Sequence, residues 1–377
     1  MRVATLVGTR PEIIKLSRVV ALLAETTDHV LIHTGQNYDR ELSQIFFDEL
    51  DMPSPDIYLD AAGDSAAETT GNVIVAVDRV LRDVRPDALL ILGDTNSALG
   101  AISAKRLRIP IFHMEAGNRC FDERVPEEIN RRIVDHLSDI NLPYTEHARA
   151  NLLREGFPSE RIVKSGSPQA EVLKHHAAAI EASDVISRLD LTAGRYLVGS
   201  VHREGNVDRK DALIETIDAM NAAIAHFDMP MILSLHPRTR DRLAANPDVG
   251  LDKRIAALPP LGLADYVALQ ANSYCVISDS GTVTEESSML GFPAVTLREV
   301  HERPEGMDTG VLVMTGRSPE RLIESINLVR NHYETTGGAE TPEDYRALDV
   351  SWRVVKTITS YTDYVNRRVW REDSLRS

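Results

Sequence analysis

The sequence predicts an α/β protein of two domains, each with a parallel sheet that helices cover on both faces. Its 377 residues are too many for one core of ordinary size, so two domains are expected. Short apolar runs alternate with longer amphipathic segments, which is the pattern of βα units. This alternation occurs twice, once up to residue 143 and again from residue 196. Each alternation therefore predicts one domain.

The first alternation takes up the amino-terminal part of the chain. Its predicted strands are short apolar runs at residues 2–8, 29–33, 88–92, 109–114 and 139–143. Its predicted helices are at residues 11–19, 40–50, 66–84 and 126–137. Pro126 suits the first turn of the last helix, because its fixed φ fits and its missing N–H is not needed there. The spacing of Ile129, Ile133, Val134 and Leu137 predicts that this helix has one apolar face.

The second alternation takes up most of the rest of the chain. Its predicted strands are at residues 196–200, 231–235, 274–278 and 294–297. Helices are predicted at residues 210–226, from 282 to 290, and at 351–365. Residues 165–178 are the predicted linker, and the domains are placed at residues 1–170 and 171–350. Two sheets of similar size predict two Rossmann-like domains facing across a cleft, with ligand sites at the carboxyl ends of both sheets.

Composition excludes several classes of partner. The formal net charge is −15 and no basic stripe is present, so we expect no nucleic acid to bind. No apolar run is long enough to span a bilayer, so we expect no membrane association. Two cysteines, Cys120 and Cys275, are too few for a disulfide framework or a cysteine zinc site. The first residues lack the pattern of a signal peptide, and a reducing cytoplasm is the expected location.

Acidic residues occur at predicted strand ends and helix starts, where α/β proteins place catalytic and binding residues. Asp94 and Glu115 each follow a predicted strand, and Glu127 and Glu128 lie in the first turn of the helix that Pro126 opens. Simpler explanations exist for each position. The helix dipole by itself favours acidic residues in a first turn, and an Asp after a strand commonly caps the next helix.

Two segments have the composition of an anion site. Ser, Gly and Thr at residues 280–282 fall between a strand and a helix, where exposed N–H groups bind phosphate, although a plain capped helix would have the same composition. Glu286, one turn later, could accept both hydroxyls of a ribose. Arg10 and Lys15 place two cations at the head of the first sheet, although Lys15 could equally be a solvated helix residue.

Histidines follow two strands of the second alternation. His202 and His236 are expected to point into one cleft. Together with His113 they lack the local spacing of a zinc site, so no metal is assigned. The common dinucleotide and P-loop fingerprints are absent from the sequence.

Together these motifs resemble those of the non-hydrolysing UDP-N-acetylglucosamine 2-epimerases. The similar segments run in family order across nearly the whole chain: GTRPEIIK (8–15), HTGQNYD (33–39), GDTN (93–96), MEAGNR (114–119), PEEINRR (126–132), HRE (202–204), HPR (236–238), SDSGTVTEES (278–287) and ERPEG (302–306). The resemblance implies a GT-B-like pair of domains, with a last helix at about 351–377 crossing back to the first domain. It also implies a UDP-sugar substrate, a homodimer, and no nicotinamide or metal.

The resemblance also implies roles for individual residues. The acid–base carboxylates would be Asp94, Glu115 and Glu127. The diphosphate would be surrounded by Arg10, Lys15 and His202, of which His202 is counted among the catalytic residues. The other substrate-binding residues would be Gln36, His236, Tyr266, Ser280, Gly281, Thr282, Glu286 and Arg303. Tyr266 would lie beside the uracil and Glu286 on the ribose.

The amino-acid sequences of two segments resemble one branch of this family more closely. Residues 113–136 and 278–288 resemble the UDP-N-acetyl-L-fucosamine synthases, which invert C2 of UDP-2-acetamido-2,6-dideoxy-L-talose for surface polysaccharide precursors. Many family members have two arginines after the histidine, whereas here Arg203 is followed by Glu204. Residues 61–70 also differ from those of members activated by a second UDP-N-acetylglucosamine. These departures count against such activation and against UDP-N-acetylglucosamine as the substrate.

The chemistry explains why acids and cations would be needed together. C2 of a 2-acetamido sugar is not beside a carbonyl, so direct deprotonation gives no stabilised enolate. If UDP leaves C1 while a base removes the C2 proton, a 2-acetamidoglycal forms, and UDP can add back as a proton arrives at the other face of C2. This route needs an acid/base group on each face and cations for the departing diphosphate. A carboxylate cluster pushes the pKa values of its members apart, which keeps one of them protonated.

Other functions remain open from the sequence. The alternative substrate is UDP-N-acetylglucosamine, giving UDP-N-acetylmannosamine. A GT-B glycosyltransferase would consume the donor and need an acceptor. A nucleotide-sugar sensor would keep Arg10, Ser280 and Glu286 but would have no use for three carboxylates. A hydrolysing epimerase would release free sugar and UDP, and the motifs do not favour it.

Overall fold

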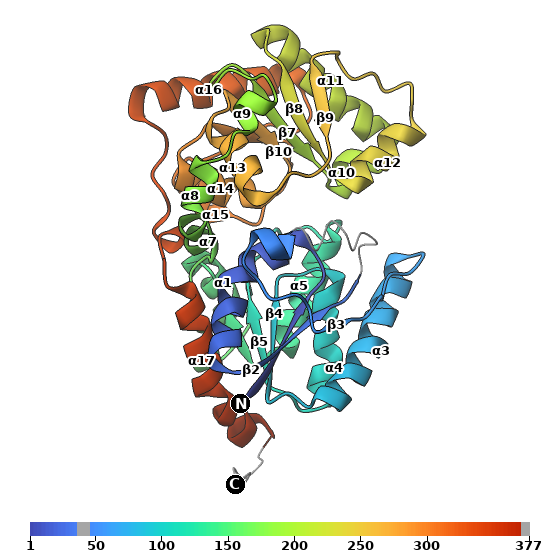
Figure 1. Cartoon of the computed structure of the whole chain (residues 1–377), viewed down its shortest axis with the longest axis vertical. Helices are drawn as coiled ribbons and strands as arrows, with labels where there is room; N and C mark the ends of the chain where they lie inside the picture. Colours follow the sequence, from blue (N-terminus) through green and yellow to red (C-terminus); the bar gives the residue numbers. More distant parts are fainter. Residues whose placement is uncertain (36–45, 371–377) are drawn as a thin grey trace. The chain divides into compact units, whose positions relative to one another are not determined.

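The chain forms two compact units, which Figure 1 shows in a computed structural model that describes residues 1–35 and 46–370. The first unit comprises Met1–His175 and Glu343–Ser377, and the second comprises His176–Pro342. The chain therefore passes between units at residues 175 and 342, rather than at 170 and 350. The predicted linker at residues 165–178 contains the helix α7 (Gln169–His175). This helix packs against α1 (Arg10–Thr26), so it belongs to the first unit.

The first unit contains a six-stranded parallel sheet among its described residues. Its strands lie in the order β3-β2-β1-β4-β5-β6 and are β1 (Arg2–Val7), β2 (Asp28–His33), β3 (Ile57–Tyr58), β4 (Ala88–Leu92), β5 (Ile111–Met114) and β6 (Ile140–Leu142). One face is covered by α3 (Ala66–Val84), η1 (Asn96–Gly100), α4 (Ala101–Arg106) and α5 (Pro126–Leu137). The other face carries α1, α7 and α17 (Val350–Val365). The helix α6 (Glu146–Arg154) follows β6. The carboxyl-terminal helix thus joins the amino-terminal sheet.

The second unit repeats this strand order. Its described sheet has the order β12-β11-β10-β7-β8-β9, with β7 (Leu197–Val201), β8 (Met231–Leu235), β9 (Ile255–Leu258), β10 (Cys275–Ser278), β11 (Ala294–Thr296) and β12 (Val313–Met314). One core contains residues of α11 (Lys210–Phe227) and α16 (Pro319–Thr336). The other contains residues of α9 (Val185–Arg188), α13 (Leu263–Ala271) and α14 (Thr282–Leu290). The remaining helices are α8 (Ala177–Glu181), α10 (Glu204–Val207), α12 (Pro237–Ala245) and α15 (Pro304–Asp308).

The predicted fold class, α/β with two Rossmann-like sheets, is confirmed. Four predicted elements have the observed bounds, namely α3, α5, β4 and β8. The strands β3, β9 and β12 were not predicted, because two of them have only two residues and β9 is a half-exposed outer strand. The predicted helix at residues 40–50 falls largely outside the described residues, of which 46–49 are helical.

The apolar residues of α5 do not share one environment, because Val134 and Leu137 pack against the core and Ile129 and Ile133 do not. Ile129 and Ile133 are 50 % and 40 % exposed. The buried residues of α5 are instead Glu128, Arg131, Val134 and Asp135, three of which are charged. A buried charge is costly unless it is paired, so the buried face of α5 has to be a network of ion pairs and hydrogen bonds.

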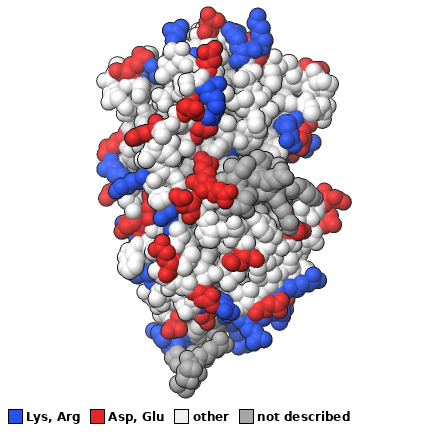
Figure 2. Space-filling model, viewed as in Figure 1, with Lys and Arg blue, Asp and Glu red and all other residues white. Residues whose placement is uncertain are grey.

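The surface carries both signs of charge. In the view of Figure 2, Asp and Glu side chains are interspersed with Lys and Arg side chains. No continuous basic stripe crosses the described residues in that view. Across the described ranges, no helix is long and apolar enough to cross a membrane.

The turn after β1 is closed by a capping box. The Glu12 carboxylate accepts hydrogen bonds from the amides of Gly8 and Thr9 at 2.6 and 2.9 Å. Gly8 packs against two buried hydroxyls, because a Cβ at this position would lie 1.9 Å from Ser97 Oγ and 2.2 Å from Thr34 Oγ1. These two hydroxyls are 2.7 Å apart and bonded to each other. Only a residue without a side chain fits here.

We therefore expect Gly8→Ala to lower the free energy of unfolding by about 1–3 kcal/mol, as overpacked cores do. The matched control is Gly71→Ala in α3, where an added Cβ meets nothing within 4 Å. The control should raise stability by up to about 1 kcal/mol through helix propensity. Urea unfolding of both variants measures the difference, and equal effects would show that the Gly8 contact does not exist.

Glu12 also makes stability depend on pH. Burial raises its pKa to about 7, against the opposing hydrogen bonds from Thr95, Gly8 and Thr9. The folded state keeps a proton that the unfolded state loses above about pH 4.3, so this contribution is present at low pH and lost as pH rises through 7. The free energy of unfolding of the wild type minus that of Glu12→Gln should be larger at pH 5 than at pH 8, by up to about 3 kcal/mol. Urea unfolding at both pH values tests this, and a difference that does not vary with pH would contradict it.

Candidate functional site

Both sheets have a point where the strand order reverses, and α/β proteins bind ligands at the carboxyl ends of the strands beside that point. It lies between β1 and β4 in the first unit and between β7 and β10 in the second. Most of the residues predicted for the site lie in the loops and first helical turns after these strands and their neighbours β5 and β8.

Asp94 follows β4 and is paired with an arginine of α5. Arg131 Nη2 and Nε lie 2.6 and 2.8 Å from Asp94 Oδ2. The Asn130 side chain donates a hydrogen bond to the Asp94 carbonyl oxygen at 3.0 Å. The side chain of Arg131 is 4 % exposed and that of Asp94 is 26 % exposed. α5 therefore fixes this carboxylate while leaving part of it accessible.

Glu115 follows β5 and is paired with a lysine of α1. Lys15 Nζ lies 3.0 Å from Glu115 Oε2, and Asn118 Nδ2 donates to Oε1 at 3.3 Å. Lys15 is buried, which excludes the solvated helix residue that its sequence position alone allowed. Glu115 has a φ of 65°, a left-handed conformation that costs a non-glycine residue about 1–3 kcal/mol. Such strain is concentrated at functional sites, which supports Glu115 as a site residue.

The two acidic residues in the first turn of α5 have different surroundings. Glu128 is fully buried and accepts a hydrogen bond from the Cys120 amide at 3.0 Å. Its oxygens also lie 3.2 Å from Arg131 and 3.0 Å from Arg132. Glu127 is half-buried. Glu128 therefore holds the loop before α5 in place, and Glu127 is the carboxylate of this pair that a substrate could reach.

Arg10 is the first residue of α1, directly after the turn that follows β1. Its guanidinium carbon lies 4.4 Å from the centre of the Phe46 ring. A planar guanidinium over an aromatic face is a favourable contact. Gln36 lies outside the described residues.

The site of the second unit is organised by Asp279, which follows β10 and is fully buried. Its carboxylate accepts hydrogen bonds from the amides of His202 and Arg203, at 3.1 and 2.9 Å, and from Asn206 Nδ2 at 3.0 Å. His202 Nδ1 lies 3.2 Å from Asp279 Oδ1. One carboxylate thus joins the loop after β7 to the loop after β10.

His202 and His236 are brought together as the sequence predicts. Their rings are stacked with centroids 5.4 Å apart. Burial lowers the pKa of His202, and the nearby Arg203 and Arg238 lower it further, against the attraction of Asp279. His236 is exposed and caps α12, accepting a hydrogen bond from the Arg238 amide at 3.2 Å. Its cap role is structural, and its role toward a ligand stays a prediction.

α14 begins at Thr282, in the segment predicted to bind phosphate. Its N-cap is Gly281, which has no capping side chain, and the Thr282 amide donates to the Ser280 hydroxyl at 3.4 Å. A hollow of about 10 Å³, room for about one water molecule, is lined by Ser280, Gly281, Arg298 and Arg303 among others. A helix N-terminus favours an anion, and each of the two guanidinium groups beside it is paired with a buried glutamate, Arg298 with Glu302 and Arg303 with Glu285.

The other predicted residues of the second unit are largely buried. Glu286 is 7 % exposed and accepts a hydrogen bond from Gln270 Nε2 at 2.8 Å. Arg303 Nη2 lies 3.4 Å from the buried Glu285. Tyr266 is half-buried on α13 and packs against the core below that helix. These contacts hold the three side chains in place and leave their ligand roles as predictions.

Sequence reasoning missed two residues that the structure places at these loops. Arg131 and Asp279 both lie within the motifs, but no role was assigned to either. The signal for Arg131 is its position one turn after Glu127 on the same helix. The signal for Asp279 is an acidic residue directly after a buried strand, as at Asp94.

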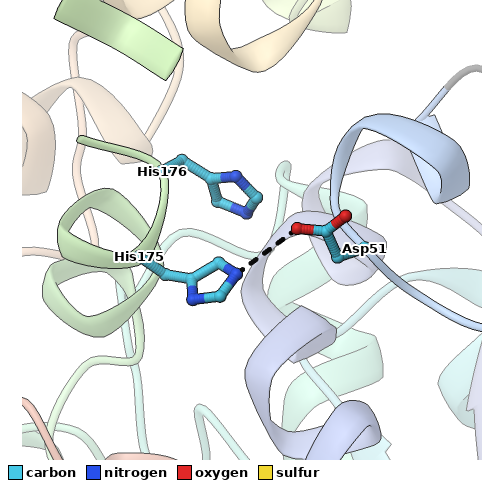
Figure 3. A group of neighbouring side chains, drawn as sticks. All are labelled: Asp51, His175 and His176. Carbon is cyan, nitrogen blue, oxygen red and sulfur yellow. Dashed lines mark ion pairs between the residues drawn. The ribbon is translucent and has the colours of Figure 1, made fainter. Parts of the chain in front are cut away.

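A second group of titratable residues lies away from these loops. Figure 3 shows Asp51 and His175 of the first unit, with His175 Nε2 3.5 Å from Asp51 Oδ2. Both side chains are exposed, at 74 % and 37 %. An exposed pair of this kind contributes about 0–1 kcal/mol and gives no reason to assign a metal, whose predicted absence stays a prediction.

Comparison with known proteins identifies the family. Residues 21–359 match the family model described as UDP-N-acetylglucosamine 2-epimerase. The chain is 34 % identical over 339 residues to the UDP-N-acetylglucosamine 2-epimerase of Methanocaldococcus jannaschii, covering 88 % of this chain and 93 % of the relative. It is 34 % identical over 331 residues to the UDP-2,3-diacetamido-2,3-dideoxy-D-glucuronate 2-epimerase of Pseudomonas aeruginosa, covering 86 % and 91 %.

Solved structures share this fold. The UDP-N-acetylglucosamine 2-epimerase from Rickettsia bellii superposes with a TM-score of 0.91 at 45 % identity, over 99 % of this chain and 100 % of that one. The Methanocaldococcus jannaschii enzyme in complex with UDP-GlcNAc and UDP gives 0.90 at 33 % identity, over 96 % and 100 %. The chain therefore belongs to the UDP-N-acetylglucosamine 2-epimerase family, as its motifs predict, and is a UDP-sugar 2-epimerase, an isomerase.

Proposed function

We propose that this epimerase converts UDP-2-acetamido-2,6-dideoxy-L-talose to UDP-N-acetyl-L-fucosamine by eliminating UDP and adding it back. The observation that carries the mechanism is the pairing of carboxylates with cations at the ends of adjacent strands. Lys15 is paired with Glu115 at 3.0 Å, and Arg131 with Asp94 at 2.6 Å. Proton transfer at C2 needs the carboxylates, and the charge that develops on the departing diphosphate needs cations.

The reaction runs in two balanced steps. In the first, one carboxylate takes the C2 proton, the C1–oxygen bond breaks, and UDP leaves with the bonding electrons, giving the 2-acetamidoglycal. In the second, UDP attacks C1 while a carboxyl on the other face returns a proton to C2. Asp94, Glu115 and Glu127 share these tasks in our proposal. Arg10, Lys15 and His202 hold the diphosphate between the two steps.

The contacts of the second unit support the placement of UDP. The amides at the start of α14, with Arg298 beside them, suit the diphosphate. A Cβ added to Gly281 would meet protein atoms only at 3.7 Å or more, so the protein itself leaves room there for a ligand to approach. Glu286, which accepts a hydrogen bond from Gln270 at 2.8 Å, is assigned to the ribose hydroxyls. Tyr266 is assigned to the uracil.

The choice of sugar rests on the motifs. One of their differences from other family members, Glu204 after Arg203, makes a contact in the structure. Glu204 stands where many members have an arginine, and its carboxylate lies 3.0 Å from Arg238. The exchange therefore changes the sign of charge beside His202. The alternative substrate is UDP-N-acetylglucosamine, supported by proteins named UDP-N-acetylglucosamine 2-epimerase at 33–45 % identity. A product of either kind would be a precursor of surface polysaccharide.

Incubation in deuterium oxide with each UDP-sugar, followed by NMR, tests both substrate and mechanism. We expect C2 of the product to carry deuterium, because the proton is exchanged during elimination. We expect the 6-deoxy-L-talo substrate to be inverted at least about 10-fold faster than UDP-N-acetylglucosamine, because one small group alone supplies that discrimination and these sugars also differ in ring configuration. Product that keeps its original hydrogen would overturn the mechanism, and a faster reaction with UDP-N-acetylglucosamine would establish the alternative substrate.

Neutral variants of the three carboxylates test their roles. Asp94→Asn, Glu115→Gln and Glu127→Gln should each lower kcat by about 10²–10⁴, the usual contribution of general acid–base catalysis. Asp83→Asn, on the exposed end of α3, is the matched control and should keep the wild-type rate. Near-normal rates in all three variants would refute the assignment.

A further inference from the structure

A buried carboxylate that the proposed reaction does not use lies beside the site of the first unit. Glu12 is in the first turn of α1 and is 3 % exposed. Its Oε2 accepts the Gly8 and Thr9 amides, at 2.6 and 2.9 Å, and its Oε1 accepts the Thr95 hydroxyl at 2.5 Å. An ordinary capping box needs only the contact within its own turn. The third contact, to a residue 83 positions away, goes beyond helix capping.

This third contact joins the two loops that flank the switch point. Gly8 and Thr9 follow β1, and Thr95 is in the loop after β4. The Thr95 hydroxyl in turn accepts a hydrogen bond from the Ser97 amide at 3.2 Å, and this bond caps the start of η1. A single carboxylate therefore fixes the turn after β1 and the first residues after β4 relative to each other.

The residues adjoining these contacts in the chain are the ones assigned to chemistry. Arg10 follows Thr9 directly, and Asp94 precedes Thr95. The side chain of Asp94 is held from its other side by Arg131, at 2.6 Å. A backbone held by Glu12 and a side chain held by α5 together define where the Asp94 carboxylate lies.

The chemistry of Glu12 suits a fixed connector. The two oxygens of the Glu12 carboxyl together accept from two amides and a hydroxyl, and above about pH 7, where the group is ionised, it donates nothing in return. Hydrogen bonds to an ionised acceptor are about twice as strong as neutral ones. Burial raises the pKa of this group to about 7, which shows that its position disfavours the charge and that the contacts oppose this effect. All three observed partners belong to the protein itself.

We propose that Glu12 and Thr95 form a clamp of positioning residues that holds Arg10 and Asp94 in register for the epimerisation. The inference rests on the proposed function for its effect on rate, and on the contacts alone for its effect on the two loops. Glu12 itself does not touch the substrate in this proposal. Because Thr95 lies at the far end of the clamp from α1, its hydroxyl can be removed without changing the capping box.

The deciding experiment compares Thr95→Val with Thr95→Ser. Valine keeps the shape of threonine and removes the hydroxyl, so kcat should fall by about 10–100-fold, the loss typical of supporting contacts to site residues. Serine keeps the hydroxyl and should restore kcat to within about threefold of the wild type. The matched control is Thr362→Val in α17, a buried threonine whose hydroxyl donates a hydrogen bond to the Ile358 carbonyl oxygen of its own helix. It should keep the wild-type kcat.

Amide hydrogen exchange gives a second readout that needs no substrate. In Thr95→Val, exchange should rise in peptides covering residues 8–12 and 93–97 together, and should return to the wild-type level in Thr95→Ser. Glu12→Ala should produce the same paired increase, and if that variant does not fold, the Thr95 variants still decide the question. A peptide covering residues 278–290 of the second unit should not change.

Two results would overturn the clamp. One is a Thr95→Val variant with wild-type kcat, or a serine variant no better than valine. The other is increased exchange in only one of the two loops. If the wild type inverted no UDP-sugar, the proposed function would be wrong, and the exchange data would still show whether the two loops are coupled through Glu12.

Discussion

The pairing of buried charge is the constraint on which the rest of this structure depends. Side chains that would be costly to bury alone are brought to the ends of the strands, where each meets a partner of opposite charge or a backbone amide. Lys15 meets Glu115 and Arg131 meets Asp94, within 3.0 and 2.6 Å. Breaking one partner of a buried pair typically costs about 3–5 kcal/mol. The loops therefore adopt conformations that satisfy these pairs, including the left-handed backbone of Glu115.

Each unit has a buried carboxylate that joins two loops at the switch point of its sheet. Both sheets reverse their strand order at one point, and a buried carboxylate lies at each. Glu12 accepts the consecutive amides of residues 8–9, and Asp279 those of residues 202–203. The first carboxylate comes from the helix after the leading strand, and the second from the loop across the switch point. In each case one acidic side chain joins two loops, which leaves neighbouring residues fixed for binding or chemistry.

Much of the fold could be predicted because burial on both faces of a parallel sheet leaves a clear pattern. Strands such as β4 and β8 are continuous apolar runs, and α3 has the period of an amphipathic helix. β9 and β12 were missed because short outer strands carry little of that pattern. α5 was misjudged for a different reason. Two of its apolar residues, Ile129 and Ile133, are exposed, because most of its buried side chains are charged. Hydrophobic periodicity does not detect a buried helix face that is made of charged residues.

The sequence by itself determined the fold class, the family through its motifs, and the strand ends at which Asp94, Glu115 and Ser280 would lie. It did so because these features depend on local patterns and on motifs that occur together in one order. Only the tertiary structure decided which acidic residue in the first turn of α5 is buried and which cation pairs with which carboxylate. It also revealed that Glu12 reaches Thr95. Such pairings depend on contacts between residues far apart in the chain, which hydrophobic spacing does not encode.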